Sequence, residues 1–96
     1  MDQKINWSKR ADSSLEKLLR YLAETESPEY ADRYLDFIQI RLREAAKYPE
    51  SGMKSQTRPG IRRYIFDKYN YAIYSIVPDG ILIRDIMHYK MNKRGF

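Results

Sequence analysis

The sequence has no cysteine and only one histidine, His88. Without cysteine the chain forms neither a disulfide nor a thiolate metal site, and one imidazole cannot build a histidine metal cluster within a monomer. We therefore expect no metal and no cofactor. No apolar run approaches the roughly 20 residues of a membrane-spanning helix. Residues 1–5 lack the apolar core of a signal peptide, so the expected location is the cytoplasm.

Acidic residues are scarce in the second half of the chain. Residues 54–96 contain nine Lys and Arg but three Asp and no Glu, a net charge of +6. Residues 1–53 contain nine basic and ten acidic residues. Basic charge gathered in one region suggests an acidic partner, either nucleic acid or an acidic protein surface. An ordinary solvated surface is the equally supported alternative.

Three short segments in this half have the composition of β-strands, at residues 61–66, 71–77 and 81–88. β-branched and aromatic residues fill them, as a pleated and half-buried surface favours. The connections 67–70 and 78–80 carry the Asp, Asn, Pro and Gly that tight turns require. The pattern predicts an antiparallel three-strand meander, which is stable only if other elements cover one face.

The first half supplies that cover. Ile5 and Trp7 alternate with a polar residue, so residues 4–7 are expected to join the sheet as a further strand. Ser8 is a candidate N-cap for a helix that ends near Glu24. A second helix is predicted from Pro28 to about Lys47. Each helix has one apolar stripe, formed by Ala11, Leu15, Leu18, Leu19 and Leu22 in the first and by Ala31, Leu35, Ile38, Leu42 and Ala45 in the second.

This order predicts a single α+β domain over residues 1–96: a strand, a two-helix antiparallel hairpin, a loop at 48–60, the meander and a basic tail. The second helix has more apolar residues than one stripe needs, namely Tyr30, Tyr34, Phe37 and Ile40. Either the helix is wedged between its neighbour and the sheet, or another chain covers this strip.

Strand alternation places His88 on one face with Leu82, Arg84 and Ile86, and it places Arg62 and Arg63 on opposite faces. His88 is either a general acid–base group or a hydrogen-bonding residue that orients the tail. Strand tyrosines can stack on bases but are also common packing residues. Trp7 is interpreted as a core residue.

Several local motifs occur in a recognisable order: Ile5-Asn-Trp7 followed by Ala11 and Leu15, Pro49-x-x-Gly52, Gly60-Ile-Arg62, Tyr71-x-Ile-Tyr74 and Ile83-x-x-Ile-Met-His88. Over nearly the whole chain this arrangement resembles the small toxins of the RelE/ParE superfamily, the toxic halves of bacterial toxin–antitoxin pairs. The resemblance implies the β-α-α-β-β-β fold and a cognate antitoxin as partner.

The ending, from His88 to Phe96, resembles the ParE-like branch, whose members inhibit DNA gyrase and lack nuclease chemistry. RelE-like members are ribosome-dependent ribonucleases that cut messenger RNA. They place lysines and an arginine on the second and third strands, where this chain retains Arg62 but has Tyr64 and Tyr71. Loss of two cations removes much of the stabilisation that phosphodiester cleavage requires. A ParE-like toxin acting by protein contact is therefore expected, with gyrase as its target.

The resemblance and the charge distribution together predict three sets of site residues. The toxic surface is expected at Arg62, Arg84, His88, Lys90, Lys93 and Arg94. The antitoxin is expected to cover the hairpin at Leu19, Leu22, Tyr30, Tyr34, Phe37 and Ile40. The alternative is a RelE-like messenger RNA interferase that acts on the ribosome, with catalytic residues Arg62, Arg84, His88 and Lys90.

Overall fold

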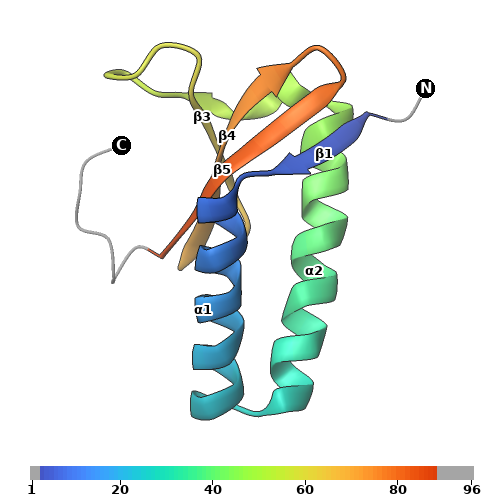
Figure 1. Ribbon diagram of the computed structural model, residues 1–96, viewed down its shortest axis with the longest axis vertical. Helices are drawn as coiled ribbons and strands as arrows, with labels where there is room; N and C mark the ends of the chain where they lie inside the picture. Colours follow the sequence, from blue (N-terminus) through green and yellow to red (C-terminus); the bar gives the residue numbers. More distant parts are fainter. Residues whose placement is uncertain (1–2, 89–96) are drawn as a thin grey trace.

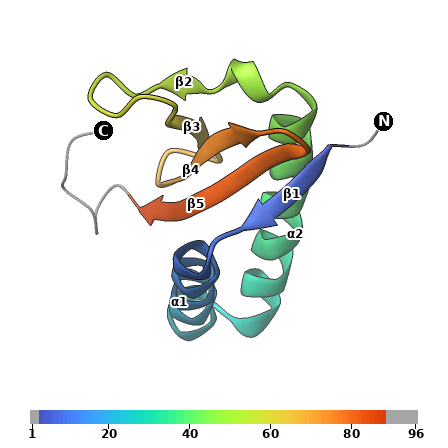
Figure 2. The same cartoon turned by 45° about the horizontal axis from the view of Figure 1, so that its top comes forward.

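In the computed structural model, which describes residues 3–88, two antiparallel helices lie on one face of a five-stranded sheet (Figure 1). Figure 2 shows both helices on the same side of the sheet. The elements are β1 (Lys4–Trp7), α1 (Lys9–Thr25), α2 (Pro28–Lys47), the 3-10 turn η1 (Pro49–Ser51), β2 (Met53–Lys54), β3 (Arg62–Ile65), β4 (Asn70–Val77) and β5 (Gly80–His88).

The α+β prediction is confirmed, together with its strand, helix-hairpin and meander order. Within residues 3–88 the sheet order is β1-β5-β4-β3-β2, and β1 pairs with β5 in parallel whereas the other pairs are antiparallel. β2 was not predicted. It is a two-residue edge strand inside the segment that the sequence indicated as a loop.

Local capping explains both helix starts. The Ser8 side chain accepts a hydrogen bond from the Ala11 amide at 3.0 Å, as predicted for an N-cap. The Ser8 amide and hydroxyl also donate to the Ile83 and Arg84 carbonyl oxygens, both at 3.0 Å, which ties the start of α1 to β5. Ser27 caps α2 in the same way, with Pro28 in the first turn. Within residues 3–88, neither helix is both long and apolar enough to span a membrane.

The core lies between the helices and the sheet. The helix stripes bury Ala11, Leu18, Ile38, Leu42 and Ala45 against Ala72, Tyr74, Ile81, Ile83 and Ile86. Ile5, Trp7 and Leu15 are partly buried and pack against this cluster. A smaller cluster lies on the opposite face of the sheet. Tyr71 and Ile73 occupy the alternate positions of β4 there, and Ile61, just before β3, packs with them.

A β-bulge in β5 overturns one prediction about side-chain direction. Ile73 pairs with Asp85 and Tyr74 pairs with Ile83, so Arg84 has no residue opposite it in β4. The extra residue reverses the alternation beyond it. Ile86 consequently joins Ile81 and Ile83 in the core, so the prediction that Leu82, Arg84, Ile86 and His88 share one face is wrong.

The Pro49-x-x-Gly52 motif has a structural explanation. The Tyr74 hydroxyl donates to the Pro49 carbonyl oxygen at 2.5 Å and accepts from the Gly52 amide at 3.1 Å. A Cβ on Gly52 would overlap the Tyr74 hydroxyl and lie 2.8 Å from the Arg63 carbonyl oxygen. Glycine is therefore required here for close approach, and the contact positions β2 at the edge of the sheet.

Candidate functional site

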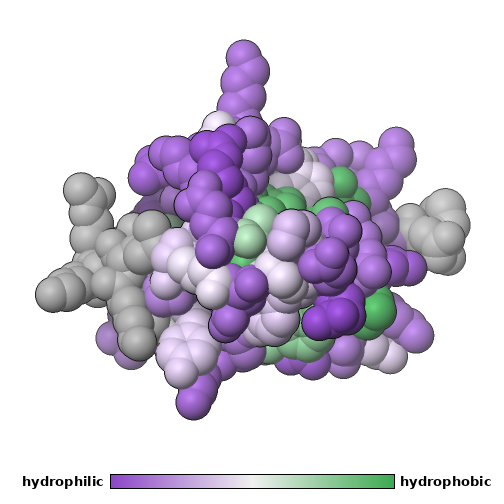
Figure 3. Space-filling view, turned by 90° about the horizontal axis from the view of Figure 1, so that it is seen from below, coloured by the Kyte–Doolittle hydropathy of each residue, from purple (hydrophilic) through white to green (hydrophobic). Residues whose placement is uncertain are grey.

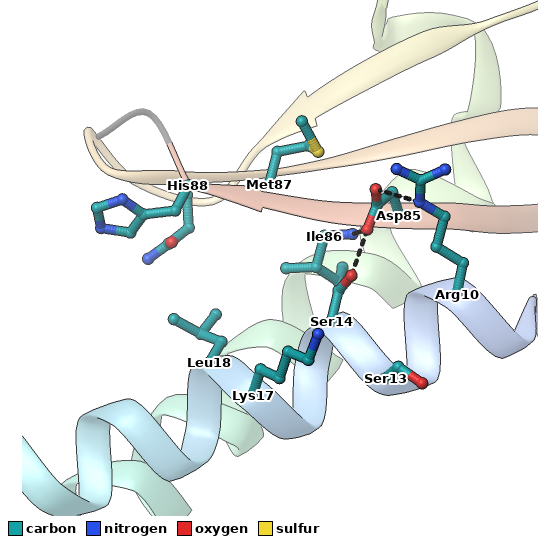
Figure 4. Close-up of a pocket in the computed structure, with 10 residues that line it drawn as sticks. Arg10, Ser13, Ser14, Lys17, Leu18, Asp85, Ile86, Met87 and His88 are labelled. Atoms are coloured by element: carbon teal, nitrogen blue, oxygen red, sulfur yellow. Dashed lines mark hydrogen bonds and ion pairs between the residues drawn. The ribbon is translucent and has the colours of Figure 1, made fainter. Parts of the chain in front are cut away.

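A cavity of about 330 Å³ lies between α1 and the last residues of β5; we call it the α1–β5 pocket. It is bounded on one side by α1 and on the other by β5 and the first residue of β4 (Figure 4). Its lining residues are Arg10, Ser13, Ser14, Lys17, Leu18, Asn70, Asp85, Ile86, Met87 and His88.

Asp85 is the buried acidic group in the wall of this pocket, with 9% of its surface exposed. Its Oδ1 accepts from the Ser14 hydroxyl at 2.5 Å and from the Ile86 amide at 2.9 Å, and its Oδ2 accepts from Arg10 Nε at 3.1 Å. Figure 4 shows Arg10 and Ser14 reaching from α1 to this carboxylate. They lie four residues apart, on one face of the helix. Asp85 thus joins α1 to β5 and keeps the Ile86 amide paired.

Asn70 belongs to a buried polar chain that connects β4 with α2. The Tyr34 hydroxyl donates its only proton to Asp67 Oδ2 at 2.5 Å, so it accepts from Asn70 Nδ2 at 2.7 Å. This pairing orients the amide and leaves Asn70 Oδ1 buried without a hydrogen-bond partner among residues 3–88. Burial, and then the hydrogen bond to Asp67, raise the pKa of Tyr34 well above its ordinary value.

Among residues 3–88, those predicted for a toxic or catalytic surface are not gathered at one point. Arg62 lies opposite Tyr74, whereas His88 lies opposite Asn70, four residues away along β4. At the rise of a β-strand this separation is roughly 13 Å. Arg84 is exposed at the bulge. Lys90, Lys93 and Arg94 lie outside the described residues.

Arg62 also has a structural role. Its Nη1 donates to the carbonyl oxygens of Glu50 at 2.9 Å and Gly52 at 2.8 Å, holding the turn before β2. His88 is half-buried, and its ring is parallel to that of Tyr69 with centroids 6.1 Å apart. Among the strand tyrosines, Tyr71 and Tyr74 are core residues, with 4% and 0% of their surface exposed.

The residues predicted to bind an antitoxin differ in exposure. Tyr34 is buried, and Leu19 and Leu22 are half-buried, whereas Tyr30, Phe37 and Ile40 are exposed. The Tyr34 ring contacts those of Tyr30 and Phe37, with centroids 6.3 Å and 5.6 Å away. Viewed from the end of the hairpin, hydrophobic surface occurs as separate patches among hydrophilic side chains (Figure 3).

A second cavity, of about 530 Å³, was not predicted. We call it the hairpin groove, because it follows α1 and α2 beside β1. It is lined by Ile5, Trp7, Asp12, Leu15, Leu35, Gln39, Leu42 and Arg43. Its helical apolar residues, Leu15, Leu35 and Leu42, belong to the stripes assigned to the core. Periodicity cannot distinguish a closely packed contact between two helices from one that leaves a groove. The sequence feature that could have indicated this groove is the pair of opposite charges beside the apolar stripes, Asp12 and Arg43.

The comparisons with known proteins point in one direction. The model of a family described as the ParE toxin of the type II toxin–antitoxin system parDE matches residues 5–93. A comparison with curated proteins finds no match.

Two solved structures are similar in fold. One is described as the chromosomal ParDE toxin–antitoxin system of P. aeruginosa, with a TM-score of 0.76 and 16% identity over 91% of this chain and 96% of that chain. The other is the E. coli DinJ–YafQ toxin–antitoxin complex, with a TM-score of 0.58 and 11% identity over 95% and 97%. Because the family match spans almost the whole chain, the protein belongs to the ParE toxin family of type II toxin–antitoxin systems.

Proposed function

We propose that this toxin inhibits DNA gyrase, and thereby replication, by direct protein contact, and that a cognate antitoxin neutralises it. The separation of Arg62 from His88, two of the candidate catalytic residues, is the observation that carries this proposal. Phosphodiester cleavage needs cations and proton donors directed at one phosphate. Arg62 is instead bound to two backbone carbonyl oxygens, four residue positions along the sheet from His88.

The test is a supercoiling assay with purified gyrase and toxin. We expect the toxin to reduce ATP-dependent supercoiling, and we expect added antitoxin to restore it. In cells, induction should cause filamentation and DNA-damage signalling while transcripts remain intact in early samples. Primer extension on an abundant transcript provides the comparison. Undiminished supercoiling at excess toxin would contradict the proposal.

The competing function is a ribosome-dependent ribonuclease, the activity of the RelE-like branch that this chain also resembles. That function would produce transcript cuts at ribosomal A-site codons within minutes of induction. Cuts that disappear in a His88→Ala variant, with gyrase unaffected, would favour the ribonuclease function. His88 would then be the general acid–base group, with Arg62, Arg84 and Lys90 as the accompanying cations.

For the antitoxin, we propose an amphipathic helix bound in the hairpin groove. Leu15 and Leu35 are only partly buried there, and Trp7 lies beside them, so the groove offers apolar surface to a helix. Asp12 and Arg43 add one charge of each sign that can set its direction. Tyr30, Phe37 and Ile40 provide further exposed apolar surface on α2 for a longer antitoxin segment.

Co-purification with the product of the neighbouring reading frame tests this placement. Leu35→Glu and Arg43→Glu should each weaken the complex at least about tenfold, because a charge is buried or reversed at the contact. Lys9→Glu, an exposed cation of the hairpin that does not line the groove, is the charge-reversal control. Ile40→Glu tests whether the antitoxin also covers the exposed apolar surface of α2. Thermal melting shows whether each variant remains folded. Loss of binding in Ile40→Glu alone would move the antitoxin to the other side of α2.

A further inference from the structure

The α1–β5 pocket has unsatisfied positive charge at its rim. Arg10 uses Nε for Asp85, but within residues 3–88 its terminal Nη atoms make no hydrogen bond. Lys17, two helical turns along the same side of α1, has no acidic partner in the described part of the chain. The Asp85 carboxylate is already occupied by three donors. An incoming anion would therefore meet two available cations.

The same pocket contains apolar surface. Leu18 and Ile86 line it beside the cations, whereas the Met87 side chain points away from α1 and packs with the smaller cluster on the opposite face of the sheet. A ligand for this pocket therefore needs a negative charge and an apolar group.

A peptide satisfies these needs better than a free phosphate. Phosphate sites are commonly built from backbone amides at a helix N-terminus. Here Ser8 already binds the Ala11 and Asp12 amides of α1. Asp85 would also repel a dianion more strongly than a single carboxylate, and a phosphate would leave the apolar lining unused. A volume of about 330 Å³ lies at the small end of ligand sites and suits one or two side chains.

We propose that the α1–β5 pocket binds an acidic side chain and its apolar neighbour from the protein that the toxin inhibits. This inference rests on the proposed function and names the chemistry of the target. Asp12 and Leu15 of α1 face the hairpin groove, whereas Ser13, Ser14, Lys17 and Leu18 line this pocket. The target site therefore lies on the flank of α1 away from the proposed antitoxin helix.

The first experiment measures binding directly. Purified toxin is titrated with the peptide acetyl-Gly-Leu-Glu-Leu-Gly-amide, its Gln analogue and inorganic phosphate, while the methyl NMR signals of Leu18 and Ile86 are followed. We expect the Glu peptide to shift these signals and to bind at least about tenfold more tightly than the Gln peptide. Lys17→Glu should abolish the difference. Lys9→Glu, an exposed cation of the same helix outside the pocket, should preserve it.

Equal binding of the Glu and Gln peptides, or shifts produced by phosphate and not by peptide, would overturn the proposal. The second experiment compares growth arrest in the same variants, with antitoxin binding as the check on folding. Lys17→Glu should lose toxicity and Lys9→Glu should retain it. If Lys17→Glu is fully toxic and the wild type still inhibits gyrase, the α1–β5 pocket is not the target-binding site, although the proposed function holds. A wild-type toxin without effect on gyrase would refute the proposed function, and the peptide titration would remain interpretable.

Discussion

Gly52 lies so close to the Tyr74 hydroxyl that a larger residue displaces its surroundings. Gly52→Ala should lower the free energy of unfolding by about 1–3 kcal/mol, the usual cost of overpacking. Urea denaturation measures the change. In a Tyr74→Phe background the same substitution should cost less, because the overlapping oxygen is gone. Equal costs in the two backgrounds would show that the space is limited by the Arg63 carbonyl oxygen and by the ring carbon Cε1, which phenylalanine retains, and not by the Tyr74 hydroxyl.

Tyr34 should make the fold sensitive to alkaline pH. Its pKa is raised in the folded state, first by burial and second by the hydrogen bond to Asp67. The contribution of Tyr34 to the free energy of unfolding is therefore fully present below the pKa of the unfolded chain, near 10. It declines above that pH, because the unfolded chain loses the proton at a lower pH than the folded chain does. Between pH 9 and pH 11 the wild type should lose about 1.4 kcal/mol more stability than Tyr34→Phe. Parallel pH profiles from urea denaturation would contradict this role.

At the scale of elements, α1 and β5 are joined by one carboxylate. Asp85→Ala leaves the Ser14 hydroxyl and the Ile86 amide without their acceptor and should cost about 1–3 kcal/mol. Arg10→Ala is the matched control, because the Arg10 side chain is 76% exposed and its ion pair should contribute under about 1 kcal/mol. Hydrogen exchange of the Ile86 amide should accelerate in the first variant and remain slow in the second. Equal losses would mean that the ion pair dominates.

At the scale of the whole molecule, the +6 charge of residues 54–96 is proposed to face the target. Lys93→Glu with Arg94→Glu should keep the melting temperature and antitoxin binding but abolish growth arrest, because charge reversal repels an acidic partner. Both positions lie outside the described residues, so melting and binding are measured in the same preparation. A fully toxic double variant, expressed at the wild-type level, would shift the toxic surface toward Lys54, Arg58 and Arg62.

Short-range information was sufficient for the elements of this protein other than β2. The Ser8 cap, the start of α2 at Pro28 and its end at Lys47 follow from residues within a few positions of each boundary. The stripes of α1 and α2 also identified most of the core, because helical periodicity determines which side chains share a face. Family motifs then supplied the superfamily and its ParE-like branch, which the match over residues 5–93 confirms.

Contacts between distant segments decided the site. The bulge at Arg84 depends on the register between β4 and β5. Beyond the bulge, the side chains of β5 point to the opposite face from the one that simple alternation had predicted. Arg62 binds the Glu50 and Gly52 carbonyls, and Tyr34 binds Asp67 and Asn70, because folding brings together residues between 10 and 36 positions apart. The sequence by itself determined where the two helices and the longer strands form, since those preferences are local, whereas the edge strand β2 depends on its pairing with β3. Only the tertiary structure decided which charges remain available beside the α1–β5 pocket, since a cation's partner depends on the packing of α1 against β5.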